Sequence, residues 1–248
     1  MRVLFSKNGI ALAVIFVAAC GGGDNSAAAN NSRASRRPPV ESTSAAASGA
    51  TAHAPAADHT GAPRVLFLGT SLTAGFGLDD PADDAYPAVI QRIADSVGVK
   101  ALVVNAGLSG ETSAGALRRA DWLLKEKPDV AVLETGANDG LRGLNTDSTA
   151  ANIRELIAKI RADNPKVKIL LVQMEAPTNM GPEYTRAFHA LFGKVAAAEK
   201  VELSPFLLNN VAGIRALNQG DGIHPTPEGA RIAAHNLWPS LAKILREK

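Results

Sequence analysis

The sequence lacks several features that would place it in a function class at once. A single cysteine among 248 residues excludes an internal disulfide and any zinc or iron–sulfur site built from several cysteines. Charge of one sign is also missing: 26 basic residues face 24 acidic ones, and Arg2 and Lys7 account for the excess of two. Residues 21–248 are therefore net neutral, so we expect no nucleic-acid partner. Aromatic residues are only 4% of the chain, which disfavours a β-sandwich.

A long hydrophobic run is absent as well. The N-terminal apolar run, Ile10 to Ala19, is too short to cross a hydrocarbon core of ~30 Å as a helix. Because two basic residues precede it and small residues follow, it has the pattern of a secretory signal peptide. The string Val-Ala-Ala-Cys-Gly ending at Gly21 resembles the bacterial lipobox, in which the cysteine is lipidated. We predict a lipoprotein signal peptide over 1–20 and lipidation of Cys20; an ordinary signal peptide or a buried strand are the alternatives.

A lipid on Cys20 would hold the protein at a membrane, since each buried CH₂ of an acyl chain contributes ~0.8 kcal/mol. The resemblance implies an exported protein of the bacterial cell envelope. Gly21 rather than Asp after the cysteine favours the periplasmic side of the outer membrane. Residues 21–62 predict a disordered tether, because Val40 is their only large aliphatic or aromatic residue. Such a segment buries too little apolar surface to offset the entropy of ordering its backbone.

Residues 63–248 alternate between short apolar runs and longer helical patterns. The runs are nearly continuous in apolar residues, which is typical of parallel strands covered on both faces. The expected strands are Val65–Leu68, Ala101–Asn105, Val130–Thr135, Lys168–Gln173 and Val201–Leu203.

The expected helices lie between and after these strands. They are Ala85–Val97, Ser113–Lys125, Thr149–Asp163, Tyr184–Glu199 and Pro227–Leu245. In the third of them Ile153, Leu156, Ile157 and Ile160 form one apolar stripe at helical spacing. This alternation predicts one doubly wound α/β domain, and such domains place their chemistry at the carboxyl ends of the strands.

Ser71 directly follows the first expected strand, in the string Gly-Thr-Ser-Leu. Glycine allows a sharp turn there, and backbone N–H groups at the start of a helix can stabilise an oxyanion that develops on an attacked carbonyl. A serine in this position suits a nucleophile. Two alternatives are open: Thr70 or Ser71 could cap the helix, or both could cradle a phosphate or flavin together with Thr73.

Three further groups bear on that choice. Asp221 precedes His224 by three residues in a loop, where an aspartate can hold the imidazole in the tautomer that accepts a serine proton. Asn138 offers an amide donor after the third strand, and Gly107 can present its backbone N–H after the second. A phosphate or flavin site needs no histidine–aspartate pair, whereas serine hydrolysis needs all of these groups. Their joint presence predicts a serine hydrolase.

These blocks resemble the SGNH hydrolase (GDSL-type esterase) family over residues 63–248. The matching residues are Ser71 in Gly-Thr-Ser-Leu, Gly107 in Asn-Ala-Gly-Leu-Ser-Gly-Glu-Thr, Asn138 in Gly-Ala-Asn-Asp-Gly-Leu-Arg-Gly and His224 in Asp-Gly-Ile-His-Pro. The last two strings are most similar to the periplasmic thioesterase I/arylesterase/lysophospholipase L1 branch. One position departs from the family, because Thr70 stands where the usual residue is Asp. The departure puts the hydrogen bonding of this loop in doubt.

The resemblance implies a single flavodoxin-like three-layer α/β/α domain with a five-stranded parallel sheet over 63–248. It implies a catalytic triad of Ser71, His224 and Asp221. It also implies an oxyanion hole formed by Ser71, Gly107 and Asn138.

The resemblance further implies that the substrate contacts Leu141, Leu144, Pro177 and Met180. The expected substrates are small acyl esters, thioesters or lysophospholipids, with no metal and no organic cofactor. We expect a monomer. Two rival functions stay open, namely a carbohydrate O-acetyl esterase of the cell envelope and a non-catalytic phosphate- or flavin-binding module.

Overall fold

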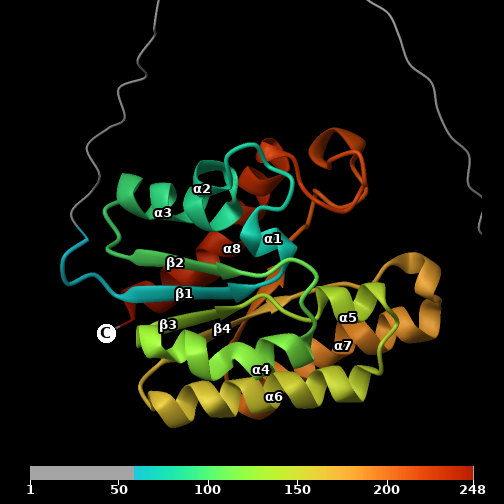
Figure 1. Ribbon diagram of the computed structural model, residues 1–248, viewed down its shortest axis with the longest axis horizontal. Coiled ribbons are helices and arrows are strands. Elements are labelled where there is room, and N and C mark those ends of the chain that lie inside the picture. Colours follow the sequence, from blue (N-terminus) through green and yellow to red (C-terminus); the bar gives the residue numbers. More distant parts are fainter. Residues whose placement is uncertain (1–58, 248) are drawn as a thin grey trace, which may run out of the picture. The chain divides into compact units, whose positions relative to one another are not determined.

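The computed structural model describes residues 59–247. The expected signal peptide over 1–20, Cys20 and the expected tether up to residue 58 lie outside the described residues. Within the described part, helices cover both faces of a parallel sheet (Figure 1). No helix between residues 59 and 247 is both long enough and apolar enough to cross a membrane.

The five strands follow the order β2-β1-β3-β4-β5, and every neighbouring pair runs parallel. Their bounds are β1 Arg64–Gly69, β2 Leu102–Gly107, β3 Val130–Leu133, β4 Lys168–Gln173 and β5 Glu202–Phe206. All five expected strands are confirmed, as is the expected fold class.

The inner strands follow the sequence pattern more closely than the edge strands do. The side chains of Val65–Leu68 in β1 and Val130–Leu133 in β3 are all buried, as expected for strands covered on both faces. The edge strand β2 is only half-buried and its Asn105 is exposed, so coverage on both faces is wrong for this strand. Pro205 lies inside the other edge strand, β5. Proline has no backbone N–H, and an edge strand tolerates this because one of its sides has no partner strand.

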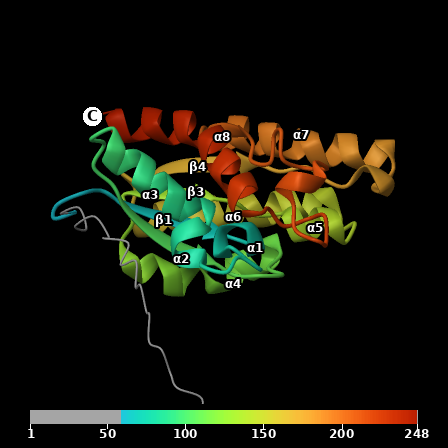
Figure 2. The same cartoon turned by 90° about the horizontal axis from the view of Figure 1, so that it is seen from above.

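Five long helices form the two outer layers (Figures 1 and 2). They are α3 Tyr86–Ser96, α4 Ser113–Leu123, α6 Thr146–Asp163, α7 Pro182–Glu199 and α8 Pro227–Arg246. Helices α3 and α8 pack together on one face of the sheet, and α6 packs between α4 and α7 on the other.

Helix α6 shows why the long helices could be predicted. Its stripe of four aliphatic residues is almost fully buried, and each such side chain contributes ~1.5–3 kcal/mol when it is removed from water. The helix begins at Thr146, before the expected start at Thr149. Asn145 accounts for the difference, because its Oδ1 accepts the N–H of Ser148 at 2.9 Å and so caps an additional turn.

Three short helices have no counterpart among the expected helix ranges, since four or five residues are too few to show a helical period; only the start of one of them, at Ser71, was expected. They are α1 Ser71–Ala74, α2 Pro81–Asp84 and α5 Ala137–Leu141. Single 3₁₀ turns lie at Leu124–Glu126, Thr178–Met180 and Arg215–Leu217.

Helix α1 follows β1 and α5 follows β3. In this strand order the direction of winding reverses between β1 and β3, so the loops after these two strands diverge and leave a crevice. The fold therefore places α1 and α5 beside the crevice.

Candidate active site

Ser71 lies where β1 turns into α1. The turn requires Gly69, because a Cβ atom at this position would lie 1.9 Å from Oγ1 of Thr73. Thr70 is extended, with φ −95° and ψ −151°, and Ser71 is the first residue of the helix. The alternative in which Thr70 caps α1 is wrong, since its side chain makes no capping hydrogen bond.

A chain of hydrogen bonds joins Ser71 to two residues far along the sequence. Oγ of Ser71 lies 2.9 Å from Nε2 of His224, and Nδ1 of His224 lies 2.6 Å from Oδ2 of Asp221. A neutral imidazole with its proton on Nδ1 donates to Asp221 and accepts the hydroxyl proton of Ser71 at Nε2. Chemically, this arrangement can activate a serine hydroxyl for attack on a carbonyl carbon.

The carboxyl group of Asp221 is held by its own loop. Its Oδ1 accepts the backbone N–H of Ile223 at 2.9 Å and that of His224 at 3.0 Å. The hydrogen bond from the His224 side chain, followed by these two backbone hydrogen bonds, lowers the pKa of Asp221 to about 2. Asp221 is therefore ionised at neutral pH, and its charge favours an imidazole that has taken up a proton.

A second set of contacts ties the His224 loop to the segment after α1. Nε2 of Gln219 donates to the carbonyl of Phe76 at 2.8 Å and to that of Pro225 at 2.9 Å. The ring of Phe76 packs on the ring of His224, with centroids 4.7 Å apart. These contacts help to hold His224 against Ser71. Gln219 could not be found from the sequence, because its partner Phe76 lies 143 residues away.

Asn138, in α5, lines the same cleft as Ser71. One N–H of its carboxamide donates to the carbonyl of Glu111 at 3.0 Å. The other N–H has no acceptor among residues 59–247 and can serve a substrate oxygen. The structure thus places Asn138 where the sequence analysis expects an oxyanion donor.

The backbone N–H of Gly107 is not available beside Ser71 and Asn138, so its expected role in the oxyanion hole requires correction. Its N–H donates to Oδ1 of Asn105 at 2.9 Å, so this donor is already engaged. A Cβ atom at Gly107 would lie 2.2 Å from the backbone nitrogen of Ala74. Gly107 is therefore required for the close approach of β2 to α1, which leaves no space for a ligand.

Gly110, in the turn after β2, has the properties that Gly107 lacks. It is exposed, its φ is +78°, and its N–H has no acceptor within the described part of the chain. The next residue, Glu111, accepts the hydrogen bond from Asn138, which brings this turn beside the Asn138 carboxamide.

A buried ion pair fixes that turn. Nε and Nη2 of Arg119 each donate to the Glu111 carboxylate at 2.6 Å, in the two-pronged geometry that arginine favours. Nη2 also donates to the carbonyl of Ala106 at 2.8 Å and to that of Gly69 at 3.3 Å. Arg119 thus joins the ends of β1 and β2 to the turn. It lies in the middle of α4, where nothing in the sequence distinguishes it from a surface arginine.

Thr70, which stands where the family usually has Asp, is hydrogen-bonded to Glu134, the residue after β3. Oγ1 and N–H of Thr70 both donate to the Glu134 carboxyl, at 2.9 Å and 2.8 Å. Burial raises the pKa of Glu134 to about 7, against the lowering effect of hydrogen bonds from Thr70 and Thr73. The backbone N–H and the hydroxyl of Thr70 are therefore both hydrogen-bonded with threonine at this position.

A cleft of about 510 Å³ lies next to Ser71. Of the four residues expected to contact the substrate, Leu141 and Pro177 line this cleft. Leu144 and Met180 do not line it, so their contact with the substrate stays a prediction; Cε of Met180 would lie 2.6 Å from a Cβ atom added at Gly143. The remaining apolar lining comes from Leu72, Ala137, Met174, Ala176, Phe206, Leu208, Ala212 and Ile223. Such a surface suits an acyl chain.

One charged residue, Glu175, lines the same cleft. Its Oε1 lies 2.6 Å from Nδ1 of His189 and also accepts a hydrogen bond from Gln173 at 3.2 Å. This pairing could not be found from the sequence, because the two residues lie 14 positions apart on different segments.

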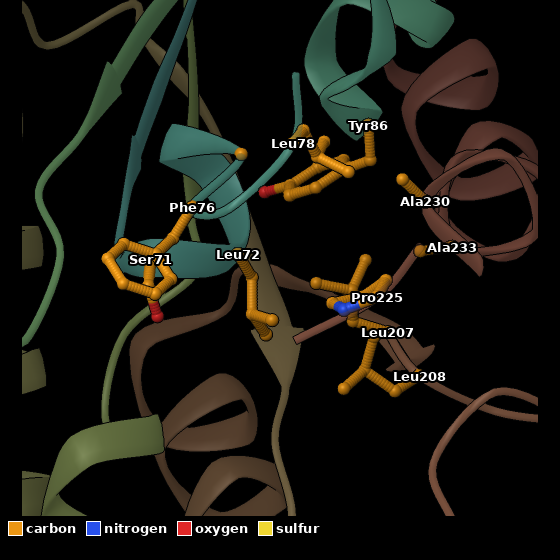
Figure 3. Close-up of a pocket in the computed structure, with 11 residues that line it drawn as sticks. Ser71, Leu72, Phe76, Leu78, Tyr86, Leu207, Leu208, Pro225, Ala230 and Ala233 are labelled. Carbon is orange, nitrogen blue, oxygen red and sulfur yellow. The ribbon is translucent and has the colours of Figure 1, made fainter. Parts of the chain in front are cut away.

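A much smaller pocket lies behind Leu72, on the core side of α1 (Figure 3). Its volume is about 10 Å³, which is at the lower limit for a single water molecule. Figure 3 shows Leu72, Leu78 and Tyr86 reaching toward it, with Ser71 at its margin. The pocket is part of the packing that supports the Ser71 turn, and the larger cleft is the candidate binding site.

Residues 67–232 match the GDSL-like lipase/acylhydrolase family. The chain belongs to this family. It is 39% identical to Esterase TesA of Pseudomonas aeruginosa over 199 residues, which cover 80% of this chain and 97% of that protein. It is 38% identical to thioesterase 1/protease 1/lysophospholipase L1 of Escherichia coli K12 over 185 residues, covering 74% and 83%.

Solved structures of this family have the same fold. A crystal structure of TesA matches with a TM-score of 0.69 and 40% identity, covering 73% of this chain and 99% of that one. The SGNH-hydrolase esterase AlinE4 matches with a TM-score of 0.61 and 35% identity, covering 75% and 98%. This GDSL family member is an ester hydrolase, an acylhydrolase of the esterase, thioesterase or lysophospholipase type.

Proposed function

We propose that Ser71 is the nucleophile of this hydrolase, His224 its general base and Asp221 the group that orients His224. The observation that carries the proposal is the unbroken chain of hydrogen bonds, 2.9 Å from Ser71 to His224 and 2.6 Å from His224 to Asp221. Ser71 also lines the apolar cleft, so a bound acyl group comes within reach of its hydroxyl.

The reaction proceeds in two steps. Oγ of Ser71 attacks the acyl carbonyl carbon while Nε2 of His224 takes the hydroxyl proton, and the departing alcohol or thiol then receives that proton. Water next attacks the acyl-enzyme, again losing its proton to His224, and the carboxylic acid leaves as the proton returns to Ser71.

The oxyanion formed in each step is stabilised by three donors. They are the backbone N–H groups of Ser71 and Gly110 and the free carboxamide N–H of Asn138, with Gly110 in place of the expected Gly107. None of the three has an acceptor within residues 59–247. Loss of one oxyanion donor typically raises the barrier by ~2.7–4 kcal/mol.

The substrate class follows from the cleft and from the relatives. An apolar cleft of about 510 Å³ has room for an acyl chain of several carbons. The relatives are named as an esterase and as a thioesterase/lysophospholipase. We therefore assign acyl esters, acyl thioesters and lysophospholipids as the substrates.

An acyl-chain series tests this function. Wild type and Ser71→Ala are assayed on p-nitrophenyl esters from acetyl to octanoyl, and both are treated with a fluorophosphonate that labels active serines. We expect wild type to be labelled and to prefer the longer esters, and Ser71→Ala to show neither property. A wild-type protein that is not labelled would contradict the proposed nucleophile.

The same series distinguishes the two rival functions. Strong preference for acetyl esters, with acetate released from an envelope polysaccharide, would favour the carbohydrate O-acetyl esterase. A purified protein that is unlabelled but yellow, or bound to a nucleotide, would favour the non-catalytic module.

We also propose that the protein acts at the bacterial cell envelope, anchored through a lipid on Cys20. The support is the sequence alone: a short apolar run after a basic start, with the only cysteine of the chain directly behind two alanines.

A further inference from the structure

We propose that Glu134 is a positioning residue for Ser71, and that it acts through Thr70 and Thr73. The proposal rests on the proposed role of Ser71 as the nucleophile. Glu134 does not line the cleft and makes no hydrogen bond to Ser71, so it holds the turn and does not touch the reacting atoms.

Hydrogen bonds from Thr70 and Thr73 connect Glu134 to both sides of Ser71. Its Oε2 accepts the N–H of Thr70 at 2.8 Å and Oγ1 of Thr73 at 2.9 Å, and its Oε1 accepts Oγ1 of Thr70 at 2.9 Å. The side chain is completely buried. Its backbone N–H donates to the carbonyl of Leu68 at 2.9 Å, which fixes Glu134 to β1. The residue before the nucleophile and the residue two after it are thus attached to one rigid carboxyl group.

Thr73 extends the network into the core. Its Oγ1 lies 2.7 Å from the hydroxyl of Tyr86. Since the Thr73 hydroxyl proton is given to Glu134, Tyr86 donates to Thr73. Tyr86 itself is buried and packs edge-on against Phe67 of β1, with centroids 5.8 Å apart. Every member of the network is therefore both hydrogen-bonded and packed.

Thr70 gives this network its particular chemistry. Its hydroxyl is a donor, so Glu134 has a complementary partner in the residue before the nucleophile. An aspartate there, the usual residue in the family, would bring a second carboxyl group into the same buried space. Thr70 and Glu134 are thus a complementary pair, in which the buried carboxyl group accepts and the threonine donates.

Glu134 acts as an acceptor, and its charge is secondary. None of the ion pairs among residues 59–247 includes Glu134. A glutamine at position 134 can keep its oxygen toward the Thr70 N–H and Thr73. Its NH₂ group then faces Thr70, whose hydroxyl can rotate to accept it. An alanine leaves the buried Thr70 N–H without an acceptor, so the turn is free to shift.

Two matched pairs of variants test the proposal in the full-length protein. Glu134→Ala is compared with Glu134→Gln, and Thr70→Val with Thr70→Ser, on a soluble p-nitrophenyl ester. Displacing a catalytic group by about 1 Å can cost about 100-fold in rate. We accordingly expect kcat of Glu134→Ala and Thr70→Val to fall by about 10- to 100-fold while KM changes less than about twofold. Glu134→Gln and Thr70→Ser should recover most of that loss. The rate of fluorophosphonate labelling should follow kcat, because it reports on the nucleophile without substrate turnover.

Leu156→Ala controls for a general loss of stability, since Leu156 is buried in α6 and belongs to neither the site nor the network. Its kcat per labelled active site should equal that of wild type. If Glu134→Ala does not fold, the Thr70 pair decides alone. Equal kcat in Thr70→Val and Thr70→Ser, or a change confined to KM, would overturn the proposal. A wild type without labelling would instead show that the proposed nucleophile is wrong.

Discussion

Asp221 and His224 define how activity should depend on pH. Because hydrogen bonds lower the pKa of Asp221 to about 2, this carboxyl group stays ionised throughout the range above pH 4. Loss of activity on acidification cannot then come from Asp221, whereas a protonated His224 can no longer accept the Ser71 proton. We expect kcat/KM on a soluble ester to fall from pH 8 to pH 5. A flat profile down to pH 4 would contradict a histidine base.

Replacement of Asp221 by Asn tests its orienting role. The carboxamide can present its N–H to Nδ1 and so stabilise the tautomer with its proton on Nε2, which cannot accept from Ser71. In serine proteases the equivalent change costs about 10⁴-fold in kcat. Asp221 is 41% exposed in its side chain, so water can partly replace it, and a loss of about 10²- to 10³-fold is expected. Asp147→Asn, on the exposed first turn of α6, provides the control.

Glu134 should make stability depend on pH in the opposite direction from an ordinary carboxylate. Burial raises its pKa from 4.5 to about 7 in the folded protein. Between these values the folded state binds the proton and the unfolded state does not. The free energy of unfolding therefore decreases as pH rises through this window, by up to about 3 kcal/mol at ~1.4 kcal/mol per pKa unit.

Urea unfolding of wild type and Glu134→Gln at pH 4.5 and pH 8 measures this effect. Glutamine does not titrate, so the difference in unfolding free energy between the two proteins should move in favour of the variant as pH rises. The same difference at both pH values would mean that Glu134 titrates normally in the folded state.

At the scale of single elements, α5 and the segment after it should set the chain-length preference. Leu141 ends α5 and lines the cleft, whereas Leu144 lies outside it, with its carbonyl bound to the hydroxyl of Tyr184 at 2.8 Å. Leu141→Ala removes apolar contact from a long acyl chain, and a few methylene groups in a pocket are worth ~1–3 kcal/mol. We expect kcat/KM for octanoyl esters to fall by about 10-fold relative to acetyl esters. Leu144→Ala is the matched control. Equal effects of the two substitutions would contradict the conclusion that Leu141, and not Leu144, lines the cleft.

Elements of ten or more residues, and strands with continuous apolar runs, could be predicted because their burial leaves a period in the sequence. Helix α6 and strands β1 and β3 are examples. The short helices α1 and α5 could not, yet they hold Ser71 and Asn138. These two residues were found from the loop motifs that contain them. Because β1 and β3 are neighbours in the sheet, the loops at their carboxyl ends lie close together.

The supporting residues of the site were missed for a different reason. Glu134 contacts Thr70 over a separation of 64 residues, and such a contact leaves no local pattern. The error at Gly107 is of another kind. Two glycines stand three residues apart in the same motif, and only the hydrogen bond to Asn105 shows which N–H is engaged.

For the whole molecule, the strand direction separates the site from the point where the described chain begins. His59, the first described residue, has its ring 4.0 Å from Asp95, near the end of α3. From this end of the sheet, β1 runs to Ser71 at the opposite end. Cys20 itself lies outside the described residues. Because the described chain begins at the end of the sheet opposite the site, we expect anchoring and catalysis to be separable.

Cys20→Ser tests that separation. Without the thiol no lipid can be attached, so the protein should move from the membrane fraction of the producing bacterium to the soluble fraction. Its kcat on a soluble p-nitrophenyl ester should stay within about twofold of wild type, because the 2.9 Å contact between Ser71 and His224 does not involve the N-terminal segment. Lysophospholipid presented in vesicles is a different case. An anchored enzyme meets that substrate at high effective concentration, so release should slow its hydrolysis while the soluble assay is unaffected. Unchanged membrane association of Cys20→Ser would refute the anchor, and an equal loss in both assays would show that the N-terminal segment supports the site itself.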